Sequence, residues 1–296
     1  MSRNYLIERQ ARLMSVQLLE QIEKGEVTLE SLKERFSKIP MPQANVIELS
    51  PIETFIVSSG SLRVTDPCYD TETWCAGTVD DVSNGTWSAF AGTAHCESDL
   101  EWSAERRAKL INDLKLEPSV SEAVRVFGEK DSSGRERTEE DIQRLARFIS
   151  TRLLDESISE LLSVELVTAA GQVGRVNYIH IHHADHAITE MDDTWVRSDI
   201  HVGVDSGQAG FFDLKQFEDQ LSEGRYEAPK WEAFYKRCCN LTLETKYSFG
   251  VIEFGAISSS GYGDGGYPLF LKRDEQGKVI TARIVFISQS DEEDEE

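Results

Sequence analysis

A block of helical periodicity interrupts a chain that otherwise has the pattern of a β-sheet. Residues 54–95, and again the residues after 163, contain segments in which apolar and polar side chains alternate between turn residues. Residues 103–163 instead place apolar side chains three and four residues apart, as amphipathic helices do. Hairpin-like turns outnumber alternating strand–helix units, so the pattern predicts an α+β fold with a mainly antiparallel, sandwich-like sheet.

The helical segments define the expected domain organisation. Residues 1–45 hold two short apolar-striped helices that end before Pro40 and Pro42, and they are predicted to form an N-terminal helical extension. Residues 46–290 are predicted to form the main β-rich domain, with a helical insertion at 103–163. Residues 291–296 are an acidic tail.

The chain is strongly acidic, with a formal net charge of -22 over 296 residues. The six tail residues account for six of these charges, so the rest of the chain still carries -16. The electrostatic field of this negative charge repels nucleic-acid phosphate and anionic lipid, which argues against a nucleic-acid or membrane partner. The acidity either keeps the protein dispersed or attracts a basic protein partner.

The chain has five cysteines, an odd number that includes one adjacent pair, and this suggests no disulfide framework. The N-terminus has no secretory signal pattern, and no apolar run reaches the ~20 residues of a membrane span. We therefore expect a cytoplasmic protein.

Acidic and glycine residues gather in three segments next to predicted strands. Backbone amides and carboxylates in such loops can surround one ligand, and carboxylate oxygens suit a divalent cation such as Ca²⁺ or Mg²⁺. The candidate ligand-binding residues are Asp66, Asp70, Asp205, Ser206, Gly207, Asp213, Gly263, Asp264, Gly265 and Tyr267. Asp205 and Asp264 are also candidate metal ligands. The alternative is structural, since Asp213 can cap the helix that starts at Leu214 and Asp205 can fix a turn.

Four of the six histidines fall between residues 180 and 186. On a strand, His180 and His182 share one face, which is a workable geometry for a metal site with two imidazole ligands. The alternative interpretation is a polar strand face near the edge of the sheet.

The glycine cluster at residues 261–266 satisfies the spacing of a dinucleotide-binding loop, but that loop must open a helix. Pro268 and the alternating residues after it favour a strand. The glycines therefore indicate a turn that needs positive φ angles. The chain also has no Gly-x-Ser-x-Gly motif for a nucleophilic serine.

Three motifs resemble those of domain-of-unknown-function family 4241, which occurs in bacteria and phages. They are GSLRVTDPCYD at residues 60–70, VGVDSGQAGFFD at 202–213 and SSSGYGDGGYPLFLKRDEQGKV at 258–279. The resemblance spans roughly residues 54–287 without the helical block, and the last motif is the most specific. It implies that the dispersed β segments form one domain of bacterial or phage origin.

Two hypotheses for the function follow from these features. In the first, the loops of Asp66, Asp205 and Asp264 form a site for a small ligand, with a divalent cation screening the carboxylates and with hydrolysis as a further activity of that site. In the second, the protein is a non-enzymatic acidic interaction protein, such as a phage accessory or host-modulating factor.

Overall fold

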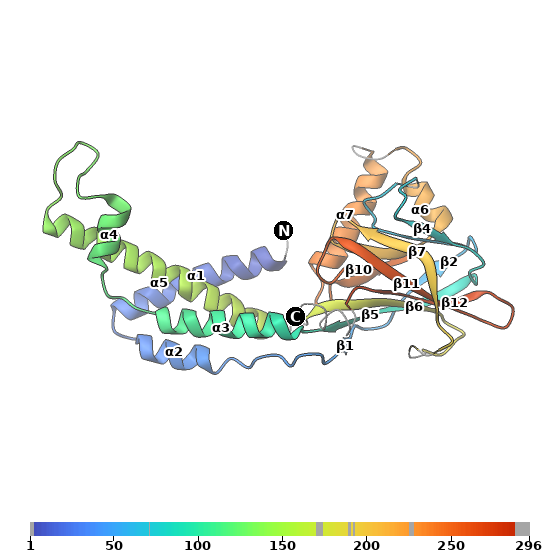
Figure 1. Ribbon diagram of the computed structural model, residues 1–296, viewed down its shortest axis with the longest axis horizontal. Coiled ribbons are helices and arrows are strands. Elements are labelled where there is room, and N and C mark those ends of the chain that lie inside the picture. Colours follow the sequence, from blue (N-terminus) through green and yellow to red (C-terminus); the bar gives the residue numbers. More distant parts are fainter. Residues whose placement is uncertain are drawn as a thin grey trace. The chain divides into compact units, whose positions relative to one another are not determined.

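The computed structural model divides the chain into two compact units, one helical and one built on β-sheet (Figure 1). It describes residues 3–70, 72–169, 174–188, 191, 193–224 and 228–287, so the acidic tail lies outside the described residues. The helical unit combines Arg3–Pro42 with residues 97–169, and the β unit combines Gln43–Cys96 with residues 174–287.

The helical unit is formed by two stretches that are far apart in the sequence. Its helices are α1 (Arg3–Glu23), α2 (Leu29–Ser37), α3 (Glu97–Asp113), α4 (Val120–Phe127) and α5 (Glu139–Ala169). A capping box starts α2, because the Thr28 side chain accepts a hydrogen bond from the Ser31 amide while the Ser31 side chain accepts one from the Thr28 amide. The N-terminal helices α1 and α2 pack on the inserted helices α5 and α3.

The core of the helical unit explains that packing. Phe36 from α2 and Ile158 and Leu161 from α5 are fully buried in one cluster with Ala11 of α1. Helices as short as α2 are marginal in isolation, so this shared apolar core stabilises them.

The β unit consists of two antiparallel sheets, as the hairpin-like turns predicted, and the α+β fold class is confirmed. The seven-stranded sheet has the order β1-β5-β6-β12-β11-β7, with β2 also paired to β5, and the five-stranded sheet has the order β4-β3-β8-β10-β9. The strands are β1 (Glu48–Leu49), β2 (Glu53–Val57), β3 (Leu62–Thr65), β4 (Gly77–Val79), β5 (Gly85–Ala94), β6 (Arg175–His183), β7 (Val196–Val204), β8 (Gln208–Asp213), β9 (Phe249–Ile252), β10 (Gly255–Ser259), β11 (Gly265–Arg273) and β12 (Val279–Val285).

One apolar cluster joins the two sheets. It takes Val64, Phe211 and Ala256 from the five-stranded sheet and Ile181 and Ile284 from the seven-stranded sheet. Two further helices, α6 (Leu214–Gln220) and α7 (Pro229–Leu243), cover the other face of the five-stranded sheet around a second cluster (Figure 1). The five-stranded sheet is therefore buried on both faces, which fits the unbroken burial of β8.

The glycine cluster opens strand β11 at Gly265 and no helix follows it. Gly261 and Gly263 have φ angles of 66° and 110°, in the region that favours glycine. The cluster is therefore a tight turn between β10 and β11, and a dinucleotide-binding loop is ruled out at this position.

The core of the helical unit can be tested by removing a buried side chain from α5. We expect Ile158→Ala to lower the free energy of unfolding by ~2–5 kcal/mol, because a fully buried isoleucine loses its contacts and leaves a cavity. Leu153→Ala, on the same helix but 53% exposed, is the matched control and should cost far less. Urea denaturation measures both, and equal losses would contradict the assigned core.

Candidate functional site

Three loops that are far apart in the sequence meet at one end of the β unit. The turn at residues 205–207 leads from β7 in one sheet to β8 in the other, and the turn at 260–264 leads from β10 to β11 in the opposite direction. Residues 66–70 follow β3, whose Thr65 is the Cα partner of Gly210 on β8. We call these three segments the three-loop junction. The strand pairing brings together the loops that carry the sequence motifs.

The carboxylate of Asp66 ties two of these loops together. Its Oδ2 atom accepts hydrogen bonds from the amides of Asp205 and Ser206, at 2.9 and 2.7 Å. Its Oδ1 atom accepts from the Ser206 hydroxyl at 2.6 Å and from the Cys68 amide at 2.8 Å. Asp66 is completely buried, so these four donors take the place of water around its carboxylate.

Asp205, in contrast, is exposed at the end of β7. The hydroxyl of Tyr69 interacts with its carboxylate and with the Cys75 thiol, and burial together with these two neighbours raises the pKa of Tyr69 well above its usual value. The segment around Cys75 lies against β7, because the Gly203 amide donates to the Cys75 carbonyl oxygen at 2.7 Å. A buried phenol thus fixes one side of an exposed carboxylate.

The third loop brings a second exposed carboxylate to the same strand ends. Gly265 of β11 is the Cα partner of Val204 of β7, so Asp264 and Asp205 are the next residues beyond that pair. The loop is held by the Ser260 amide, which donates to the Gly207 carbonyl oxygen at 3.0 Å, and by the Tyr267 hydroxyl, which donates to the Gly263 carbonyl oxygen at 2.7 Å.

The other two candidate aspartates have structural hydrogen-bond partners. Asp213 caps α6 through the Gln216 amide and accepts hydrogen bonds from the Ser58 and Ser59 amides at 2.7 and 2.8 Å. Asp70 accepts from the Thr73 hydroxyl at 2.8 Å within its own loop. Asp213 sits at the far end of β8 from the junction.

Helix α7 adds residues that sequence reasoning missed. The Tyr235 hydroxyl interacts with the Ser206 hydroxyl and the Cys239 thiol, and burial raises the pKa of Tyr235. Gln208 donates to the Cys239 sulfur at 3.5 Å. The four-residue spacing of Tyr235 and Cys239 predicts a shared helix face, but nothing in the sequence indicates that this face meets Ser206.

The candidate metal ligands do not form one group. Among the residues that the structure describes, no cluster of three or more His, Cys, Asp or Glu side chains is placed to hold a metal ion. His180 and His182 lie on β6, where Arg283 donates from Nε to His180 Nδ1 at 3.2 Å. That bond leaves the proton of the neutral imidazole on Nε2, so His180 presents no lone pair for a metal. No disulfide joins any of the five cysteines, all of which lie within the described residues.

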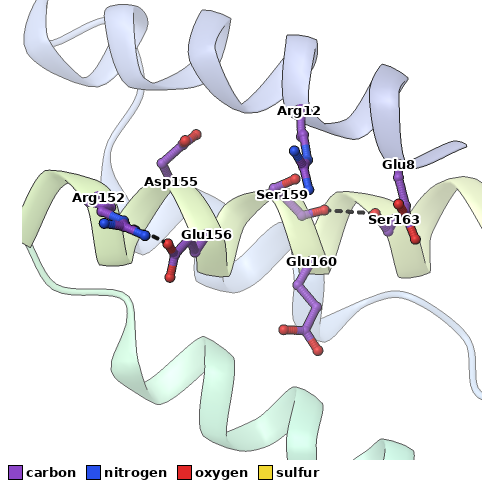
Figure 2. A pocket seen from close by; sticks show the side chains of 8 residues that line it. All are labelled: Glu8, Arg12, Arg152, Asp155, Glu156, Ser159, Glu160 and Ser163. Carbon is purple, nitrogen blue, oxygen red and sulfur yellow. Dashed lines mark hydrogen bonds and ion pairs between the residues drawn. The ribbon is translucent and has the colours of Figure 1, made fainter. Parts of the chain in front are cut away.

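The helical unit has its own charged pocket of about 630 Å³ between α1 and α5 (Figure 2). Three of its carboxylates already have partners: Glu156 pairs with Arg152 at 3.0 Å, Asp155 accepts from Ser15, and Glu160 pairs with Arg106. These contacts give the pocket a role in holding the helices, so we place the candidate functional site at the three-loop junction.

The role of Asp66 can be tested by substitution. We expect Asp66→Asn to lower the free energy of unfolding by ~1–3 kcal/mol. In either orientation of the asparagine, its NH₂ group replaces one acceptor oxygen of Asp66. The two buried donors that this oxygen served then lose their acceptor. Asp199→Asn, at an exposed position of β7, is the control. A loss no larger than that of the control in urea denaturation would show that Asp66 does not hold the loops together.

Asp213 should make stability depend on acid pH. Burial raises the pKa of its carboxyl, but the hydrogen bonds from the Ser58, Ser59 and Gln216 amides outweigh burial and lower it overall. The stabilisation is therefore present above the unfolded value of 3.8 and is lost as the pH falls through the lower folded value. We expect Asp213→Ala to cost ~0.5–2 kcal/mol at neutral pH. This difference from the wild type should shrink below pH 3.8. A difference that stays constant down to the acid transition would contradict this.

Comparison with known proteins gives one match. Searches of the curated proteins and of the solved structures found no match. No helix in the described part of the chain combines the length and the apolar character needed to cross a membrane. Residues 200–284 match the family described as Protein of unknown function (DUF4241), and this segment runs from within β7 to within β12 and includes two of the three loops. The segment 200–284 of this chain is thus similar to domain-of-unknown-function family 4241.

Proposed function

We propose that the β unit is a binding module for a positively charged group, which it takes at the three-loop junction. The observation that carries this proposal is the placement of two exposed aspartates, Asp205 and Asp264, directly beyond the last paired residues of β7 and β11. Two like charges at adjacent strand ends favour the approach of a cation. The net charge of -22 adds a long-range attraction for the same ligand.

An exposed aromatic ring narrows the class of cation. Trp74 is 87% exposed, and it precedes Cys75, whose carbonyl oxygen is bonded to Gly203 two residues before Asp205. An exposed indole ring and a carboxylate are the groups that recognise alkylammonium and guanidinium ions, so we assign Trp74 and Asp205 to the same ligand. The favoured ligand is therefore an organic cation, and a divalent cation is the competing ligand.

The proposal covers binding and not hydrolysis. Asp66 does not serve as a general base, because both of its carboxylate oxygens accept hydrogen bonds from protein donors. The cation itself can belong to a small amine or to a Lys or Arg side chain of a protein partner. The second case corresponds to an acidic interaction protein, and the two sources share the same recognition chemistry.

Tryptophan fluorescence can test the binding site directly. Putrescine and arginine methyl ester are titrated into the full chain, with 1,4-butanediol as the uncharged analogue of putrescine and with a Lys/Arg-rich peptide as the model of a protein partner. We expect a saturable change with the cations alone, and Trp74→Phe should abolish it. Tighter binding of the peptide than of the amines would identify a protein partner as the source.

Two aspartate variants decide whether the junction is the site. Asp205→Asn should weaken binding about tenfold, which corresponds to ~1.4 kcal/mol, whereas Asp199→Asn on the same strand should leave it unchanged. A titration with Ca²⁺, Mg²⁺ and Mn²⁺ covers the competing ligand. Binding of the organic cations that survives Asp205→Asn and Asp264→Asn together, or saturation by a divalent cation alone, would refute the proposal.

A further inference from the structure

Helix α1 has apolar side chains on two opposite faces, and only one of these faces contributes to the core of the helical unit. Ala11 and Leu18 are buried in that core, and Ser15 between them donates a hydrogen bond to α5. Leu13 and Val16 lie on the other side of the helix, where they are 60% and 50% exposed. These two side chains are three residues apart, so they form one apolar patch that faces away from the core.

Arg9 and Glu20 extend this patch in both directions along α1. Positions 9, 13, 16 and 20 are separated by four, three and four residues, the spacing that keeps side chains on one stripe of a helix and that occurs in coiled coils. Arg9 and Glu20 are both exposed. Within the part of the chain that the structure describes, neither side chain forms an ion pair or a hydrogen bond. We call Arg9, Leu13, Val16 and Glu20 the α1 stripe.

The charges of α1 are distributed unfavourably with respect to its own dipole. The first half of the helix contains three arginines and one acidic residue, Glu8, whereas the second half contains two glutamates and no basic residue. The first turn has no acidic residue and the last turn has no basic residue. The helix dipole favours the opposite distribution. A second α1 helix that runs antiparallel to the first places an oppositely charged half against each half.

We propose that the α1 stripe is a self-association surface, and that the stripes of two copies of this chain pack antiparallel about a two-fold axis. In this dimer Leu13 of each copy lies against Val16 of the other, and Arg9 of each copy lies against Glu20 of the other. The stripe is thus complementary to itself, as a two-fold interface requires. A parallel pairing places Arg9 against Arg9 and Glu20 against Glu20, and the repulsion of these like charges disfavours it.

The remaining side chains of α1 leave room for this contact. Figure 2 shows Glu8 and Arg12 on the side of α1 that faces α5, where they line the charged pocket. Gln10 and Gln17 are exposed beside the stripe, and their amides are uncharged, so they add no repulsion between the two copies. Helix α1 belongs to the helical unit and the proposed cation site to the β unit, so the dimer does not depend on that site.

Sedimentation equilibrium of the full chain over a range of concentrations measures the dimer directly. A contact of one helix per subunit is small, so we expect a reversible rise from the chain mass of 33.4 kDa to twice that value as the concentration increases. Leu13→Glu should raise the dissociation constant at least tenfold, because it places a charge in the apolar centre of the contact. Leu153→Glu, at a 53% exposed leucine of α5, adds the same charge outside the stripe and should associate like the wild type.

Two results of this experiment would overturn the proposal. One is a wild-type protein that stays monomeric at every concentration. The other is equal association of the wild type, Leu13→Glu and Leu153→Glu, because the dimer then forms without the stripe. Leu13 is exposed, so its substitution leaves the helical core intact, and urea denaturation of each variant verifies that it folds.

Charge reversal tests the antiparallel pairing. Arg9→Glu and Glu20→Arg should each raise the dissociation constant at least tenfold, because each sets like charges against one another at both ends of the contact. The Arg9→Glu/Glu20→Arg double variant should associate like the wild type, since both ion pairs are restored with their signs exchanged. An equimolar mixture of the two single variants should form a heterodimer, in which two glutamates of one copy meet two arginines of the other.

The double variant and the mixture separate this contact from other ways of covering the stripe. If the single variants lose association and neither the double variant nor the mixture recovers it, the stripe packs on a different surface and the antiparallel pairing is wrong. If both single variants associate like the wild type, the dimer forms elsewhere and the proposal is also wrong.

Discussion

The hydrogen bonds to the Asp66 carboxylate are the constraint on which the end of the β unit depends. One buried side chain holds the loop after β3 and the turn between β7 and β8, which lie 139 residues apart in the sequence. That turn also carries the chain from one sheet to the other, so the same contact fixes the position of the corner of the sandwich. All four donors are backbone or hydroxyl groups of the protein, so the role of Asp66 is to order the junction.

The two aspartates of adjacent loops therefore have different physical roles. Asp66 is buried and saturated with donors, whereas Asp205 is exposed and contacts the phenol of Tyr69. A buried carboxylate is stable only with such donors, and an exposed one keeps the capacity to bind a ligand. The same division appears between Asp213, which caps α6 and anchors two serine amides, and Asp264 in the turn before β11.

The sequence by itself determined the type of most elements, although residues 164–169, which it predicted as β, belong to helix α5. Alternation and turn residues predicted the antiparallel sheets, and Pro268 predicted a strand after the glycine cluster. The sequence also suggested that Asp213 caps a helix, and in the structure it caps α6. Only the tertiary structure decided which of these residues meet. The contact of Asp66 with Ser206, the approach of Tyr235 and the alignment of His180 with Arg283 all depend on strand order and register. Local patterns record which face a residue occupies, whereas its long-range neighbours depend on how the whole chain closes its core.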